Sequence, residues 1–174
     1  MMETVLVLRI PEAEALVSSW RLKYDSSAIH GMPAHVTVLF PFRPFEAIDS
    51  HCAAKLASIF SASASFDLRF WRLGRFTGTL WLAPEPGEPI VQFTNAVAAA
   101  FPDCQPYGGA FPEPIPHLTV AQGDEPLLDN IAGQLVSALA TPIHSRVAAC
   151  SLFAREPDGW REKRRFPLLG ASAG

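Results

Sequence analysis

The chain has 174 residues and a formal net charge of −3, and 49% of its residues are hydrophobic against 18% charged. This composition excludes a disordered segment and favours a globular fold with its own core, as one domain or as two small lobes that share a core. The acidic balance excludes a protein that coats nucleic acid non-specifically, because such binding depends on neutralising many phosphates, although it permits binding of a small nucleotide or an oligonucleotide end.

The cysteines and the N-terminus indicate the compartment. Cys52, Cys104 and Cys150 are odd in number, widely spaced and in no metal-ligand pattern, which is typical of a reducing environment. Residues 1–10 lack the basic region and cleavage site of a signal peptide. No stretch approaches the roughly 18 apolar residues that a membrane span needs. We therefore expect a cytoplasmic protein that does not enter a membrane.

Two strands and two helices alternate in the first third of the chain. The strands are short apolar runs that end at a proline. The first helix carries acidic residues in its first turn, where they favour the helix dipole. The expected ranges are 4–10 and 36–40 for the strands and 12–23 and 48–61 for the helices, with a loop over 24–34 and a turn over 41–44.

A hairpin and a helix occupy the middle of the chain. Residues 66–75 and 79–83 are expected to be strands on either side of the turn Phe76-Thr77-Gly78, and 90–101 is expected to be a helix. Residues 102–116 contain five prolines and form the longest irregular segment. Loops of this length in a compact domain are usually functional or mobile, so we consider a cover over a bound substrate and a rigid connector equally.

The last third repeats the alternation. A second apolar strand over 118–121 precedes a helix over 126–139, which Asp124 is placed to cap. Residues 143–154 are predicted to be one long strand, paired with 160–166 through a turn at Pro157-Asp158-Gly159. Largely antiparallel sheets with outer helices make this an α+β fold.

A tetrapeptide in the first half recurs in the second. His35-Val36-Thr37-Val38 is repeated as His117-Leu118-Thr119-Val120, and we expect each copy on a central strand of its half of the chain. Side chains on a strand alternate between faces, so each histidine shares a face with its threonine while the apolar residues face the core. One copy alone would be a weak signal, whereas two matched copies predict a small site with two imidazoles and two hydroxyls.

The repeated His-x-Thr-Val pattern resembles the signature of the two-histidine (2H) phosphoesterase superfamily, which includes 2′-5′ RNA ligase-like proteins and cyclic phosphodiesterases. The segments 31–42, 80–84 and 160–168 also look similar to that family, so the resemblance spans nearly the whole chain. It implies one domain over residues 1–174, made of two lobes with pseudo-twofold symmetry and an active cleft between them.

The resemblance also implies the chemistry. His35 and His117 would be the catalytic acid and base, Thr37 and Thr119 would bind the phosphate, and no metal or cofactor would be needed. Histidine titrates near neutral pH, so such a pair can hold one neutral and one protonated ring. The implied substrate is a 2′,3′-cyclic phosphate of an RNA end or of a small nucleotide, with 2′-5′ ligation as the reverse reaction. The sequence leaves open which histidine is the acid, and it predicts a monomer.

Other residues have two interpretations each. Phe42, Tyr107 and Phe111 are candidates for stacking on a nucleobase or for packing, and Arg43 for a phosphate contact or a surface salt bridge. The basic cluster Arg161, Lys163, Arg164 and Arg165 fits a phosphate-binding rail or, as we favour, a charged sheet edge.

Two other functions stay open. In a metallohydrolase, the two histidines would be ligands together with Asp103 or Asp124, although no close ligand spacing supports this. In a non-catalytic nucleotide-binding module, the pocket would be kept without turnover.

Overall fold

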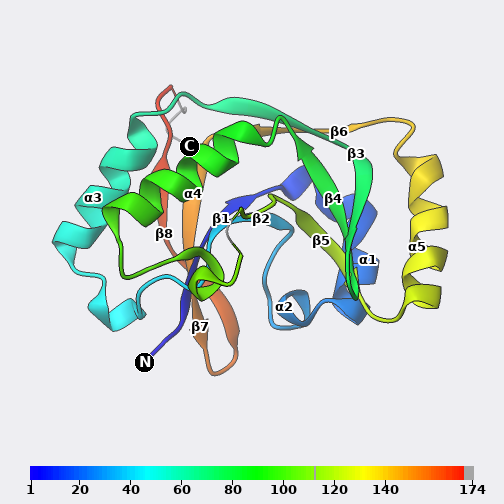
Figure 1. Ribbon diagram of the computed structural model, residues 1–174, viewed down its shortest axis with the longest axis horizontal. Coiled ribbons are helices and arrows are strands. Elements are labelled where there is room, and N and C mark those ends of the chain that lie inside the picture. Colours follow the sequence, from blue (N-terminus) through cyan, green and yellow to red (C-terminus); the bar gives the residue numbers. More distant parts are fainter. Residues whose placement is uncertain (112, 171–174) are drawn as a thin grey trace.

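The computed structural model describes residues 1–111 and 113–170, which form two four-stranded antiparallel sheets (Figure 1). The strand order is β2-β1-β7-β8 in the first sheet and β5-β4-β3-β6 in the second. The first sheet contains β1 (Thr4–Arg9), β2 (His35–Leu39), β7 (Ala149–Glu156) and β8 (Gly159–Pro167). The second contains β3 (Phe66–Phe76), β4 (Thr79–Glu85), β5 (Leu118–Gln122) and β6 (Ile143–Val147).

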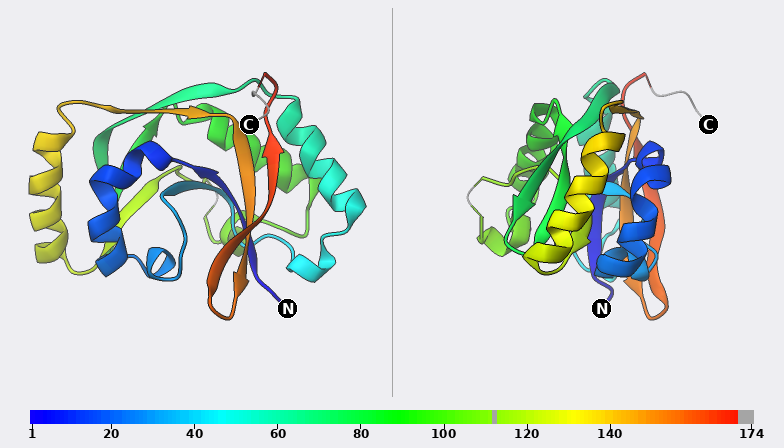
Figure 2. Two further views of the ribbon diagram at one scale, coloured as in Figure 1. Left: turned by 180° about the vertical axis from the view of Figure 1, so that it is seen from behind. Right: turned by 90° about the vertical axis from the view of Figure 1, so that its right-hand side faces the viewer.

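Each sheet carries two of the longer helices, which gives two similar lobes (Figure 2). Helices α3 (Ser50–Ser61) and α4 (Glu88–Ala100) pack on the first sheet, and α1 (Glu14–Tyr24) and α5 (Glu125–Ala138) pack on the second. A short helix, α2 (Ser26–Ile29), lies within the expected loop. The α+β class is confirmed. No helix in the described part of the chain is long and apolar enough to cross a membrane.

The predicted helix cap is also confirmed. The Asp124 carboxylate accepts a hydrogen bond from the Leu127 backbone N–H at 3.0 Å, which satisfies one of the free donors at the start of α5. Asp49 caps α3 in the same way, through the Cys52 N–H at 2.7 Å.

Both motif strands lie at sheet edges, so the prediction that they are central was wrong. Among the described residues, β2 pairs with β1 alone and β5 with β4 alone. Their free edges approach each other at the centre of the molecule (Figure 1). Hydrophobic alternation reports which face of a strand is buried and not how many neighbours the strand has, which is why the sequence could not distinguish the two positions.

The predicted long strand over 143–154 was also wrong, because the chain changes sheets at Ala148. β6 pairs with β3 in the second sheet, whereas β7 lies between β1 and β8 in the first. No glycine or proline marks this break in the sequence. As a result the first lobe combines the two ends of the chain, and the lobes do not correspond to its halves. The β7–β8 hairpin itself was predicted correctly.

A buried ion pair fixes the segment that leads into β2. Arg21 on α1 and Asp25 are each 2% exposed, and the Arg21 Nε donates to an Asp25 oxygen at 3.0 Å. The Arg21 guanidinium also donates to the Met32 carbonyl at 3.2 Å, while Asp25 accepts from the Ser27 N–H at 2.9 Å. These contacts tie α1 and α2 to the residues just before His35.

We predict that Arg21→Met lowers the free energy of unfolding by about 3–5 kcal/mol, because it leaves the Asp25 carboxylate buried without its partner. Arg146→Met is the matched control, since it breaks an ion pair with Asp67 whose side chains are 59% and 70% exposed. The control should cost less than about 1 kcal/mol. Urea unfolding of both variants measures the difference, and equal losses would contradict the role given to Arg21.

Candidate active site

The two motif strands turn their apolar sides to the core and their polar sides to a shared cavity. Val36, Val38, Leu118 and Val120 are at most 2% exposed. The side chains of the alternate positions line one cavity of about 420 Å³ between the sheets: His35, Thr37, His117 and Thr119. The structure therefore brings together all four residues that the repeat singled out.

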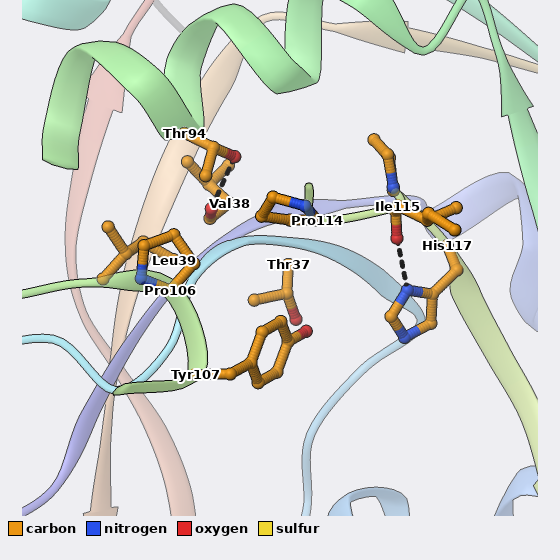
Figure 3. Close-up of a pocket in the computed structure, with 10 residues that line it drawn as sticks. Thr37, Val38, Leu39, Thr94, Pro106, Tyr107, Pro114, Ile115 and His117 are labelled. Carbon is orange, nitrogen blue, oxygen red and sulfur yellow. Dashed lines mark hydrogen bonds between the residues drawn. The ribbon is translucent and has the colours of Figure 1, made fainter. Parts of the chain in front are cut away.

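Both histidine rings are held by the same backbone contact. Nδ1 of His35 lies 2.8 Å from the Pro33 carbonyl oxygen. Nδ1 of His117 lies 2.8 Å from the Ile115 carbonyl oxygen, a contact that Figure 3 shows. A carbonyl can only accept, so Nδ1 carries the hydrogen in each ring and donates it. Nε2 of each neutral ring then keeps its lone pair for another partner.

Burial keeps both rings neutral. Desolvation lowers the pKa of His35 from 6.5 to about 4, although the hydrogen bond to Pro33 opposes this shift. The positive charge of nearby Arg21 acts in the same direction as burial. Desolvation also lowers the pKa of His117, against the effect of its bond to Ile115. In the free protein both rings are therefore uncharged at neutral pH.

Aromatic rings behind His117 fix its position. The Phe76 ring meets His117 edge to face with centroids 5.0 Å apart, and the Trp81 ring centroid lies at 5.9 Å. Gly74 stands opposite Trp81 across β3 and β4, and a Cβ at Gly74 would lie 2.3 Å from the Trp81 ring. Sequence reasoning missed this glycine, although glycine inside a strand often marks such a close approach.

Tyr107, one of the predicted contact residues, does line the cavity. Its N–H donates to the Phe40 carbonyl at 2.6 Å, and its hydroxyl lies beside that of Thr37 (Figure 3). The Tyr107 backbone has φ 50° and ψ 36°, a left-handed conformation that is unfavourable for a residue with a side chain. Burial raises the pKa of its phenol, with Thr37 acting the other way, so it is a neutral donor at the site.

Phe111 lies next to Tyr107 but outside the main cavity. Their ring centroids are 5.7 Å apart, and Phe111 is 60% exposed. It lines an adjoining cavity of about 550 Å³ that shares Tyr107, His117 and Thr119 with the first. The irregular segment over 102–116 thus contributes side chains to both cavities.

The other two predicted contacts lie away from the cavity. Phe42 is 5% exposed and packs edge to face on Phe101, with centroids 5.2 Å apart. Arg43 donates from Nε and Nη2 to the two carboxylate oxygens of Asp103, at 2.9 and 2.8 Å. Phe42 is therefore a packing residue and Arg43 forms a salt bridge. The turn after β2 directs both side chains toward the end of α4 rather than toward the cleft.

The aspartates considered as metal ligands are engaged elsewhere. Asp103 pairs with Arg43, and Asp124 caps α5. Across residues 1–111 and 113–170, no three His, Cys, Asp or Glu side chains come together in a way that could hold a metal ion. In the basic cluster, Arg161 pairs with Asp158 and Lys163 with Glu156, along the edge strand β8.

Several cavity residues were not predicted from the sequence. They come from the segment around α2, from the end of β5 and from the β7–β8 hairpin, and include Ser26, His30, Gln122, Arg155 and Trp160. His30 is exposed and lies on the cavity wall at the end of α2. The hairpin could be placed at the cleft only once the pairing of β7 with β1 was known.

Comparison with known families agrees with this geometry. The profile of the 2′-5′ RNA ligase superfamily matches residues 10–159. The chain belongs to this superfamily of 2H phosphoesterases. Comparison with curated proteins found no match.

Solved structures share the fold at low sequence identity. The structure of E. coli LigT complexed with 3′-AMP is 17% identical with a TM-score of 0.59, over 96% of this chain and 98% of that one. The LigT complex with NADP⁺ is 18% identical with a TM-score of 0.57, over 97% and 98%. A structure described as a phosphoesterase is 16% identical with the same TM-score and coverage. Membership of the superfamily favours phosphoesterase activity for this chain.

We predict that Gly74→Ala lowers kcat/KM by about tenfold or more, because the new methyl displaces Trp81 and with it His117, and small displacements of side chains in an active site are costly. Overpacking should also reduce stability by about 1–3 kcal/mol. Gly133→Ala on the exposed face of α5 meets no neighbouring atom and is the control. It should leave activity unchanged and stabilise the helix by about 0.5–1 kcal/mol. Full activity in Gly74→Ala would show that Trp81 does not position His117.

Proposed function

We propose that the protein opens 2′,3′-cyclic phosphates, at RNA ends or on small nucleotides, without a metal ion. The observation that carries this proposal is the matched pair of histidines. Each donates Nδ1–H to the carbonyl two residues earlier, and each keeps Nε2 available on the wall of one cavity. Hydrolysis of a cyclic phosphodiester needs a base for the water and an acid for the leaving oxygen, which is what two such rings supply.

We assign His35 as the base. With a pKa of about 4 it is neutral near pH 6–7, so Nε2 can take a proton from water as the water oxygen bonds to phosphorus. His117 would then give a proton from Nε2 to the ribose oxygen that leaves. A bound phosphate anion favours the protonated form of His117, because an opposite charge nearby raises a histidine pKa.

The phosphate oxygens would be bound by hydroxyl groups. Thr37 and Thr119 lie beside the two histidines on the cavity wall, and Tyr107 adds a third hydroxyl next to Thr37. Such donors are fixed before the reaction begins and stabilise the charge that develops on the phosphate. Tyr107 and Phe111 also offer ring faces to a nucleobase in the adjoining cavity.

The proposal accounts for the nucleotide complexes of a structural relative, since LigT has been solved with 3′-AMP. Ligation through a 2′-5′ bond is the same chemistry in reverse, with a nucleotide hydroxyl in place of water. A non-catalytic binding module would not need two imidazoles anchored in the same tautomer. A metallohydrolase would need a third ligand, and both candidate aspartates have other partners.

Replacing either histidine tests the proposal. His35→Asn and His117→Asn should each lower kcat by about 10²- to 10⁴-fold on 2′,3′-cyclic nucleotides assayed in excess chelator, because each removes one proton-transfer group. His144→Asn, at an exposed position on β6, is the control and should retain full activity. Circular dichroism checks the fold of all three. Activity that is lost in chelator and restored by a divalent metal, or that survives in a folded histidine variant, would refute the proposal.

The pH dependence follows from the two lowered pKa values. The kcat/KM of the wild type should rise with pH through about 4, as His35 loses its proton and becomes a base. As the pH rises further, kcat/KM should fall again, because His117 loses the proton that it must donate. This fall should begin at a pH below 6.5, since burial lowers the pKa of His117 from 6.5. The optimum therefore lies between these limits. An optimum above pH 7, or a flat profile with chemistry rate-limiting, would contradict the assignment.

A further inference from the structure

One charged side chain on the cavity wall has no role in the chemistry described above. Among the described residues that line the cavity, Asp25 and Arg155 carry a formal charge. Asp25 is neutralised by Arg21, whereas Arg155 forms no ion pair with any residue in the ranges 1–111 and 113–170. The cavity therefore offers one uncompensated guanidinium to an incoming ligand.

The fold places this guanidinium on an apolar support. Arg155 stands opposite Trp160 across β7 and β8, and its guanidinium carbon lies 5.6 Å from the centroid of the Trp160 ring. Trp160 is 8% exposed and belongs to a small apolar cluster with Val5, Met32 and Phe153. Charges next to such a low-dielectric surface attract anions more strongly than charges in open water.

Backbone hydrogen bonds fix this part of the hairpin. The Arg155 N–H donates to the Glu3 carbonyl at 2.8 Å, and the Trp160 N–H donates to the His30 carbonyl at 2.7 Å. Arg155 and Trp160 are thus tied to two other segments of the chain, of which His30 also lines the cavity. The backbone that carries the guanidinium is therefore fixed before a ligand arrives, and the Trp160 ring supports the side chain, which reduces the entropy lost on binding.

The strand register separates Arg155 from Thr37, the residue that shares the polar face of β2 with His35. Thr37 pairs with Val7 and Val7 pairs with Ser151, so Arg155 lies two strands away and four residues further along β7. That is about 13 Å along the strand and roughly 10 Å across the sheet between backbones. An extended arginine side chain covers only part of this span. Arg155 is therefore out of reach of a phosphate held between His35 and His117.

We propose that Arg155 binds a second phosphate of the substrate, one nucleotide unit away from the phosphate that reacts. This inference rests on the proposed function and narrows its substrate class. The preferred substrate carries a phosphate on the 5′ oxygen of the terminal nucleoside, as an RNA 3′ end does, and a cyclic nucleoside monophosphate without it is a poorer substrate. The planar guanidinium suits this role because its N–H groups bind two phosphate oxygens at once.

The test compares three substrates: adenosine 2′,3′-cyclic phosphate, its 5′-phosphorylated form, and a dinucleotide that ends in the cyclic phosphate. The wild type should prefer the 5′-phosphorylated mononucleotide, the dinucleotide or both over adenosine 2′,3′-cyclic phosphate, by about tenfold or more in kcat/KM. A charge-assisted contact between the guanidinium and the second phosphate allows a preference of this size. The 5′-phosphorylated mononucleotide carries a terminal 5′ phosphate and the dinucleotide carries a bridging one, so comparing these two substrates shows which kind Arg155 binds. Arg155→Gln should remove the preference while changing the unphosphorylated substrate by less than about threefold.

Arg164→Gln is the matched control. Arg164 is an exposed arginine on β8 that forms no ion pair with the described residues and does not line the cavity, so its variant should keep the full preference. A purely structural role for Arg155 on Trp160 would lower the rates on all three substrates together. A wild type that shows no preference, or an Arg155→Gln variant that keeps it, would overturn the proposal.

A binding measurement separates this inference from the proposed function. Calorimetry with adenosine 3′-phosphate and adenosine 3′,5′-bisphosphate needs no turnover. The wild type should bind the bisphosphate about tenfold more tightly or better, and Arg155→Gln should bind the two alike. If no cyclic phosphate is hydrolysed, the proposed function fails while this comparison still decides the role of Arg155. Equal affinities in the wild type would overturn that role.

Discussion

The site depends on one hydrogen bond made twice, from histidine Nδ1–H to the backbone carbonyl two residues earlier. That carbonyl belongs to Pro33 or Ile115, in the irregular segment before an edge strand, so no neighbouring strand uses it. The bond fixes both the tautomer and the direction of each ring. Because the same hydrogen bond occurs in each lobe, two imidazoles of the same tautomer line one cavity.

The surrounding packing makes the two otherwise similar histidines different. His35 is the more strongly desolvated by the protein around it, and Arg21 adds to the lowering of its pKa, so it suits the role of a base. His117 rests against Phe76 and Trp81 and borders a second cavity lined by Phe111. Pseudo-symmetry thus supplies two imidazoles, and the contacts that break the symmetry are the basis on which we propose separate roles for them and a nucleotide site on the side of His117.

Local signals predicted much of this structure, and long-range pairing accounts for what they missed. The alternation in each motif placed His35 and His117 on a polar face, and Asp124 capped its helix as expected. The edge position of both motif strands and the change of sheet at Ala148 depend on partners far along the chain, which periodicity does not encode. For the same reason Phe42 and Tyr107 looked alike in sequence, although one lies in the core and the other at the site.

The most direct test of this account is a long-range ¹H–¹⁵N NMR spectrum of the histidine side chains, recorded from pH 4 to 8 with and without a nucleoside 3′-phosphate. The account predicts that His35 and His117 both carry their hydrogen on Nδ1 in the free protein and titrate below the ordinary value of 6.5. The nucleotide should shift the Nε2 signals of both rings. A hydrogen on Nε2 of either neutral ring, or a nucleotide that leaves one of the rings unchanged, would contradict it.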